Sequence, residues 1–229
     1  MNELDSHYTP TIITLKEVNC YLIKLEDGCV LIDTSFTSQR EALESRLDEL
    51  GLKPGNLNLI ILTHGDFDHV GNAAYLRNKY ETKIAMHSGD LGMVEHGDLF
   101  ASRTSRGVII RSIAKVIMFI TRMGLKKKDH FKPDIILEEG DQFLEFKFDA
   151  KVVYLPGHSK GSIGILTPDN DLFCGDVFMN HTEPTTTSLI DNQDEFEGTL
   201  EKIKNLNPRM IYPGHGEPFK TEQYFIDDV

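Results

Sequence analysis

Short apolar segments rich in β-branched residues open the chain and predict a sheet. They are TIITL (11–15), VNCYLIKL (18–25) and GCVLID (28–33), and turn residues such as Gly28 separate them. Short apolar runs that alternate with tight turns are typical of an antiparallel meander. We therefore expect the N-terminal segment to form hairpin-linked strands.

Helical periodicity predicts four helices, over about residues 38–50, 71–80, 107–124 and 192–206. In the first, Leu43, Leu47 and Leu50 repeat at helical spacing, and Ser38 with Glu41 matches a capping box. Further apolar runs predict strands at residues 58–63, 83–87, 135–137, 142–148, 151–156, 164–167, 171–176 and 210–216. Two strand-rich halves, each ending in a helix and a strand, indicate an α/β fold: a four-layer αββα sandwich in a single domain over residues 1–229.

The composition is that of a globular protein, because 40% of the residues are hydrophobic and 26% are charged. A net charge of −12 argues against general nucleic-acid binding, so no nucleic-acid partner is expected. The three cysteines, an odd number, do not indicate a disulfide framework and are expected to be buried thiols. The sequence has neither a membrane span nor an export signal, which predicts a cytoplasmic protein.

One basic segment departs from this acidic average. Between residues 101 and 132, nine basic residues and one acidic residue give a local charge of +8, which leaves −20 for the rest of the chain. Apolar residues recur there at helical spacing, while Arg111 and Lys115 share another stripe, so we expect a basic amphipathic helical insertion at about residues 97–132. Three interpretations stay open: a substrate lid, a helix that only completes the fold, and a helix that adsorbs to an anionic membrane. Membrane contact is favoured only by the basic amphipathic pattern of this segment.

The residues that carry chemistry are histidines and aspartates near the ends of predicted strands. Seven of them are candidate metal ligands: His64, Asp66, Asp68, His69, His158, Asp176 and His215. Four lie in the run LTHGDFDHVGN (62–72), and the others follow apolar strands in PGHS, CGD and YPGHG. A single His-x-Asp is more simply explained by helix capping, but side chains at several strand ends can converge on one rim of a sheet. Imidazole and carboxylate ligands suit divalent zinc, manganese or iron.

In these motifs and their order, the chain resembles the metallo-β-lactamase superfamily of dinuclear metallohydrolases. The resemblance covers nearly the whole chain, and includes the NCYLI strand and the VLIDT strand that contains Asp33. It implies the metallo-β-lactamase fold and two divalent metal ions per chain. The implied ligand sets are His64, Asp66 and His158 for one ion, Asp68, His69 and His215 for the other, and Asp176 bridging both. Asp33 would support the ligands without binding metal itself. Asp68 would orient the metal-bridging hydroxide and take the proton of the water from which it forms.

Asp66 departs from the family pattern. The usual loop is His-x-His-x-Asp-His, and Asp66 stands where the second histidine is expected. Three carboxylates and one hydroxide then balance the charge of two divalent ions, so the ions should be poorer Lewis acids. The harder oxygen ligand favours Mn or Fe, whereas the family as a whole favours Zn.

The resemblance implies a dinuclear metal-dependent hydrolase that acts on a small-molecule thioester, lactone or other acyl bond. The basic segment indicates an anionic or partly apolar substrate, and the candidate substrate contacts are His181, Arg111 and Lys115. About 14 residues follow His215, too few for the C-terminal helical domain of glyoxalase II, so a strict glyoxalase II is not expected. One alternative is a phosphodiesterase or other phosphate-ester hydrolase, since two metals also stabilise phosphoryl oxygens. Another is an iron-dependent oxidoreductase, which the carboxylate of Asp66 suggests.

Overall fold

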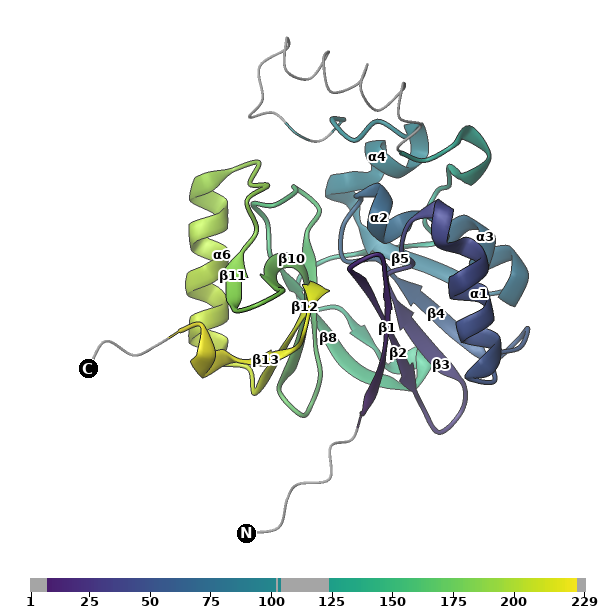
Figure 1. Ribbon diagram of the computed structural model, residues 1–229, viewed down its shortest axis with the longest axis horizontal. Coiled ribbons are helices and arrows are strands. Elements are labelled where there is room, and N and C mark those ends of the chain that lie inside the picture. The colour runs from purple at the N-terminus through teal and green to yellow at the C-terminus, as the bar shows by residue number, and fades with distance from the viewer. Residues whose placement is uncertain (1–7, 102, 104–123, 226–229) are drawn as a thin grey trace.

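The computed structural model describes residues 8–101, 103 and 124–225 (Figure 1). The helix expected at residues 107–124 lies, apart from its last residue, outside this part of the chain. The candidate substrate contacts Arg111 and Lys115 also lie outside the described residues, so their role stays a prediction.

The strands of the structure are short and mostly buried. Their bounds are β1 Pro10–Leu15, β2 Val18–Lys24, β3 Cys29–Ile32, β4 Leu57–Ile61, β5 Lys83–His87, β6 Ile135–Leu137, β7 Gln142–Phe143, β8 Phe148–Tyr154, β9 Ile163–Leu166, β10 Asp171–Asn180, β11 Pro184–Thr186, β12 Met210–Gly216 and β13 Phe219–Lys220. The α-helices are α1 Arg40–Glu49, α2 Phe67–Val70, α3 Ala73–Tyr80, α4 Leu91–His96 and α6 Gln193–Leu206. The 3-10 turns are η1 Thr37–Gln39, η2 Ser88–Asp90, η3 Lys127–Asp129, η4 Leu144–Phe146 and η5 Thr221–Gln223.

Hydrogen bonds join all of these strands in one path, β6-β5-β4-β3-β2-β12-β10-β9-β8-β7, with β1, β11 and β13 paired at its sides. Strands β1 to β3 are antiparallel, as the meander pattern predicts, whereas β3 to β6 run parallel. The two halves meet where β12 pairs with β2, through His215 opposite Val18. The two sheets of the expected sandwich are therefore the two halves of one curled sheet.

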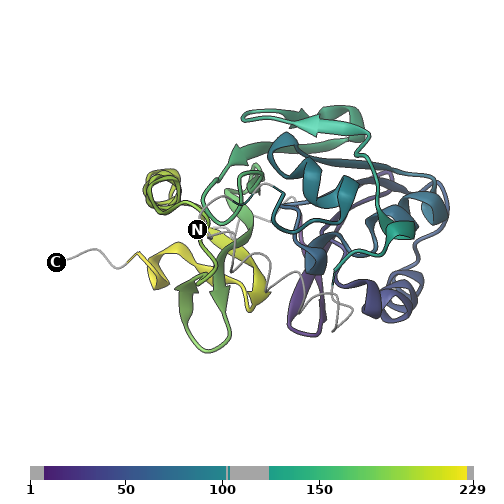
Figure 2. The same ribbon diagram turned by 90° about the horizontal axis from the view of Figure 1, so that it is seen from above.

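The curled sheet carries helices α1, α3 and α6 on its outer faces (Figures 1 and 2), and an apolar core lies between its two halves. Ile32 and Leu59 of one half lie in the same buried cluster as Phe148 and Ile165 of the other. A second cluster lies between the N-terminal half and helices α1 and α3, and a third lies between the C-terminal half and α6. This order of helix, sheet, sheet and helix confirms the predicted α/β fold class.

Two local predictions are wrong. Residues 142–148 do not form one strand, because β7 ends at Phe143 and the chain turns through η4 before β8 begins. Lys147 has a φ of 57°, a left-handed conformation that an apolar pattern does not reveal. The capping box at Ser38 is also absent, since η1 and α1 both begin without a side-chain cap. Thr37 instead donates to the Gly71 carbonyl, so a tertiary contact holds the entry to the helix.

The cysteines are buried and free, as expected. Burial is the main cause that raises the pKa of the Cys20 and Cys174 thiols well above their ordinary value, so neither is a thiolate at neutral pH. Among the described helices, none is both long enough and apolar enough to cross a membrane.

Candidate metal centre

Four histidines and three aspartates from both halves of the sheet meet in one cluster. His64 follows β4, Asp66 precedes α2, Asp68 and His69 lie on α2, His158 follows β8, Asp176 lies on β10 and His215 lies on β12. Their ligand atoms form three overlapping groups, each within 4.8 Å: His64, Asp66 and His158; His64, His69 and Asp176; and Asp68, His69 and His215. All of these residues except Asp68 are buried. The structure therefore brings together the seven side chains that the sequence analysis selected.

A bulge in β10 carries Asp176 into the cluster. Between β10 and β12 the register shifts after Gly175, so residues 176–178 face the single residue Gly214. Gly175 has a φ of 53°, a conformation that favours glycine. The strand predicted at 210–216 has the observed bounds of β12 and contains His215, whereas β10 continues beyond the predicted end at Asp176 as far as Asn180.

Backbone carbonyls orient two of the histidines. Nδ1 of His158 donates to the Leu189 carbonyl at 2.6 Å, and Nδ1 of His215 donates to the Glu17 carbonyl at 2.9 Å. Because a carbonyl oxygen only accepts hydrogen bonds, Nδ1 carries the proton in both rings. Nε2, on the side of the cluster, keeps its lone pair in the neutral ring.

Asp33 orients the other two histidines. Its Oδ2 lies 2.8 Å from Nδ1 of His69 and also accepts the Thr63 hydroxyl at 2.8 Å. Since the Thr63 hydroxyl donates its only proton to Asp33, the hydroxyl oxygen accepts from Nδ1 of His64, 3.0 Å away. All four rings therefore present Nε2 to the cluster, which is the orientation that a metal-ligating histidine needs.

The inward atoms fit a metal ion. Within the described part of the chain, Nε2 of His64, Nε2 of His69 and Oδ1 of Asp176 are buried without a hydrogen-bond partner. A buried polar atom without a partner destabilises the folded chain, and a bound cation would supply the partner. Imidazole nitrogens and carboxylate oxygens suit Zn, Mn and Fe. The cluster is thus able to bind metal.

The negative charge of its carboxylates favours the binding of cations in the cluster. Burial by itself raises the pKa of Asp176, but the positive charge of protonated His69 holds that pKa well below its ordinary value. Burial by itself lowers the pKa of His69, but the charges of Asp176 and Asp33 raise it well above its ordinary value. Protons and metal ions therefore compete for the same negative site, and we expect metal affinity to fall as the pH is lowered.

Arg103 lies at this site, although the sequence analysis did not select it. Its Nη2 lies 2.8 Å from both carboxylate oxygens of Asp66, and each of the two residues is only 6% exposed. Burial alone raises the pKa of Asp66, but the positive charge of Arg103 holds it well below its ordinary value. One signal was available, because a buried extra carboxylate needs a positive partner and the basic segment supplies nine candidates. From Asp66 we expected the charges of three carboxylates, one hydroxide and two divalent ions to sum to zero. The positive charge of Arg103 makes that sum positive.

Asp90 is a second residue that sequence patterns did not select. Its Oδ2 accepts the Gly65 amide at 2.9 Å and the Ser159 hydroxyl at 2.6 Å, and its Oδ1 accepts the Gly161 amide at 3.0 Å. These partners adjoin ligands from the two halves of the sheet, so one buried carboxylate holds two ligand loops together. Asp90 lies three residues after β5, a position like those used to select the candidate ligands, but no local pattern reveals its hydrogen bond to Ser159.

His181 and Asp68 lie at the open side of the cluster. The ring of His181 is exposed, and its centroid lies 6.3 Å from that of His215. The Asp68 side chain is 18% exposed, and its Oδ2 lies 3.6 Å from Nε2 of His215. Contact of His181 with substrate stays a prediction.

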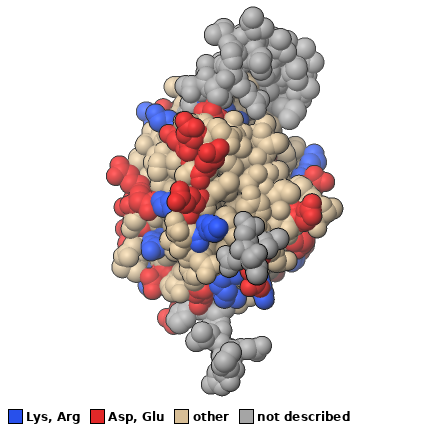
Figure 3. Space-filling model, turned by 90° about the vertical axis from the view of Figure 1, so that its left-hand side faces the viewer, with Lys and Arg blue, Asp and Glu red and all other residues tan. Residues whose placement is uncertain are grey.

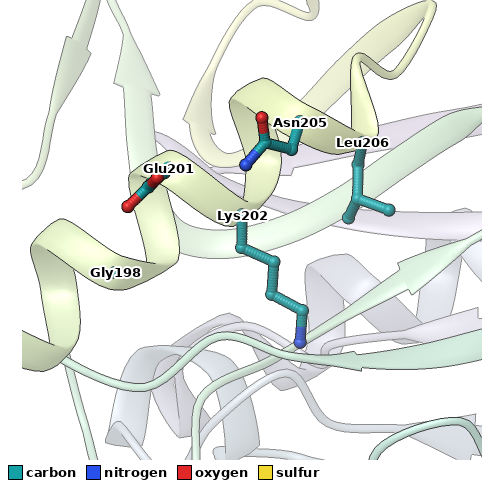
Figure 4. Close-up of a pocket in the computed structure, with 5 residues that line it drawn as sticks. All are labelled: Gly198, Glu201, Lys202, Asn205 and Leu206. Carbon is teal, nitrogen blue, oxygen red and sulfur yellow. The ribbon is translucent and has the colours of Figure 1, made fainter.

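A surface depression of about 400 Å³ along α6 is not part of the cluster (Figure 4). It is lined by Gly198, Glu201, Lys202, Asn205 and Leu206. Lys202 already donates to Glu139 at 2.8 Å and to the Tyr154 carbonyl at 3.0 Å. The outer side of α6 is acidic, since Asp194, Glu195, Glu197 and Glu201 are exposed, and acidic side chains gather on that side of the molecule (Figure 3). We assign no chemistry to this depression.

Comparison with known proteins identifies the family. A family model described as "Metallo-beta-lactamase superfamily" matches residues 13–215. The chain belongs to this superfamily. Among its relatives, the chain is 28% identical over 209 residues to "Hydroxyacylglutathione hydrolase GloC" of Haemophilus influenzae, covering 89% of this chain and 88% of that protein.

Two further proteins are similar to the chain. The human "Acyl-coenzyme A thioesterase MBLAC2" is 28% identical over 179 residues, which cover 73% of this chain but only 59% of that protein. A crystal structure of TTHA1623 in a di-iron-bound form superimposes with a TM-score of 0.68 at 24% identity, covering 93% of this chain and 94% of that one. The family match and the likeness to a solved structure described as a metallo-beta-lactamase family protein, with a TM-score of 0.69, confirm the metallo-β-lactamase fold. The relatives are named as hydrolases, and the chain is a metal-dependent hydrolase, as its sequence predicts.

The substitution Asp33→Asn tests the orientation of His69. An amide keeps the shape of the carboxylate, but an amide nitrogen in the place of Oδ2 donates, which forces the proton of His69 onto Nε2. We expect metal affinity to fall roughly 10- to 100-fold while the fold is kept. Competition with a coloured chelator measures the affinity, and Asp171→Asn, at a buried aspartate paired with Arg209, is the matched control. Wild-type affinity in Asp33→Asn would contradict the proposed role of Asp33.

Proposed function

We propose that this protein hydrolyses a small-molecule thioester at a two-metal centre formed by the cluster. The observation that carries the proposal is the common orientation of four Nε2 atoms toward three carboxylates. Two relatives are named for hydroxyacylglutathione and acyl-coenzyme A, which are both thioesters. Lactones and other acyl bonds react by the same attack on a carbonyl carbon and belong to the same proposal.

The ligands divide into two sites. Site 1 comprises His64, Asp66 and His158, and site 2 comprises Asp68, His69 and His215. Asp176 faces histidines of both sites, since its Oδ1 lies 3.2 Å from Nε2 of His69 and its Oδ2 lies 4.0 Å from Nε2 of His64. When bound, two divalent ions lower the pKa of a water and neutralise the charge that develops on the carbonyl oxygen.

Asp68 is the proposed general base, and later the general acid, of the reaction. With 18% exposure, its side chain is more open than those of Asp66 (8%) and Asp176 (7%), so it can reach a water at the mouth of the cluster. The attacking water forms a bond to the carbonyl carbon and gives a proton to the Asp68 carboxylate. The carbon–sulfur bond then breaks, and Asp68 returns the proton to the departing thiolate.

Steady-state hydrolysis tests this function. We compare kcat/KM for one thioester and one aryl phosphodiester with Mn-loaded and Zn-loaded protein, using chelated protein as the blank. We expect activity that requires metal and a higher kcat/KM for the thioester. A preference for the phosphodiester would overturn the proposal in favour of a phosphate-ester hydrolase. Oxygen consumption by an iron-loaded protein that hydrolyses neither compound would favour the oxidoreductase.

A further inference from the structure

The guanidinium of Arg103 lies against the ligands of site 1. Its Nη2 is 2.8 Å from each carboxylate oxygen of Asp66 and 3.4 Å from Nε2 of His158. Zinc, by comparison, binds oxygen and nitrogen ligands at about 2.0 to 2.2 Å. An ion held by Asp66 and His158 would need the same atoms that Arg103 now contacts.

This contact makes it difficult for Arg103 and a metal ion to bind Asp66 and His158 at the same time. Nε2 of His158 has a single lone pair, which can face either an N–H donor or a metal ion. Both oxygens of Asp66 already accept from Arg103, and this ion pair is buried, where like charges repel strongly. A divalent ion in site 1 would therefore lie beside a fixed positive charge unless Arg103 moved away from Asp66.

Site 2 has no such competitor among the described residues. The ion pairs of Asp68 and Asp176 involve only histidines, and no described lysine or arginine joins them. The negative charge of these two carboxylates is therefore available to a metal ion. Among the described residues, site 1 thus has a positively charged neighbour and site 2 has none.

We propose that Arg103 and a metal ion compete for Asp66, so that the centre fills in two unequal steps. Site 2 binds its ion first, and site 1 binds an ion only as Arg103 leaves Asp66. This inference rests on the proposed metal centre and is independent of the substrate.

Metal titration of the wild-type chain and three variants tests the inference. Metal-free protein is titrated with Mn²⁺ and with Zn²⁺ at fixed pH by calorimetry, backed by chelator competition. Arg103→Gln and Arg103→Met remove the charge, and Arg40→Gln is the matched control because Arg40 pairs at 2.7 Å with the buried Asp129. In the wild type and in Arg40→Gln we expect the second ion to bind at least about tenfold more weakly than the first. Both Arg103 variants should strengthen the weaker site by about tenfold or more and leave the stronger site unchanged.

Two results would overturn the inference: equal affinities for the two ions in the wild type, or a weaker site that neither Arg103 variant strengthens. The wild-type titration decides the first point even if a variant folds poorly. Failure to bind any ion would remove the proposed metal centre as well. Loss of thioester hydrolysis with two unequal ions bound would contradict only the proposed substrate.

Discussion

Asp176→Ala is expected to lose bound metal and hydrolytic activity together. The carboxylate of Asp176 is the group that faces histidines of both sites, and its Oδ1 is buried without a hydrogen-bond partner among the described residues. Removing it takes away several kcal/mol of charge stabilisation, which corresponds to roughly a 10³-fold fall in kcat/KM. Metal content by mass spectrometry and kcat/KM on the thioester measure the two losses.

Asp171→Ala is the matched control for this variant. Asp171 lies in the same strand and is also buried, but it pairs with Arg209 at 2.6 Å rather than with the cluster. We expect this control to lower stability and to keep its metal. If Asp176→Ala retained both ions or full activity, that result would contradict the role of Asp176 as a metal ligand.

Gly214→Ala should have the second largest effect, because this glycine lies directly beneath the cluster. A Cβ atom at Gly214 would lie 2.2 Å from Oδ1 of Asp176 and 2.8 Å from Cε1 of His69, closer than atoms can approach. The new methyl group must displace two ligands, so we expect metal affinity to fall by roughly 100-fold. Overpacking of a buried site should also cost about 1 to 3 kcal/mol of stability.

Gly198→Ala provides the control for added volume. Gly198 lies in α6, and a Cβ atom there meets nothing within 4 Å. Alanine in a helix is favoured over glycine by about 1 kcal/mol, so this variant should be slightly more stable and bind metal as the wild type does. Chelator competition and thermal unfolding distinguish the two variants. Wild-type metal affinity in Gly214→Ala would contradict the arrangement of Gly214 beneath Asp176 and His69.

Local chemistry explains why much of the cluster can be selected from sequence. His64 follows a continuous apolar strand, and His158 and His215 are each preceded by glycine near a strand, so their positions on the sheet follow from short-range patterns. A chain that alternates such strands with helices must bring these points to one rim. Histidine and aspartate are metal-binding residue types, so their presence at this rim identifies the candidate ligands.

Contacts distant in sequence explain what the patterns miss. Arg103 meets Asp66 across 37 residues, and its basic segment offers no spacing that distinguishes it from its neighbours. Asp90 bonds to Ser159 across 69 residues. The bulge at Gly175 depends on the register of two strands that are paired in space. Each of these features follows from tertiary packing rather than from local propensity.

The most direct test of the metal centre is anomalous X-ray diffraction from crystals of the protein saturated with Mn²⁺ or Zn²⁺, recorded at the absorption edge of the metal. The account predicts two anomalous peaks inside the cluster, roughly 3.5 to 4 Å apart, one in each site and with Asp176 between them. In the same crystals, Arg103 should have left Asp66. Absence of any peak within the cluster at saturating metal would contradict the central claim that these seven side chains form a two-metal centre.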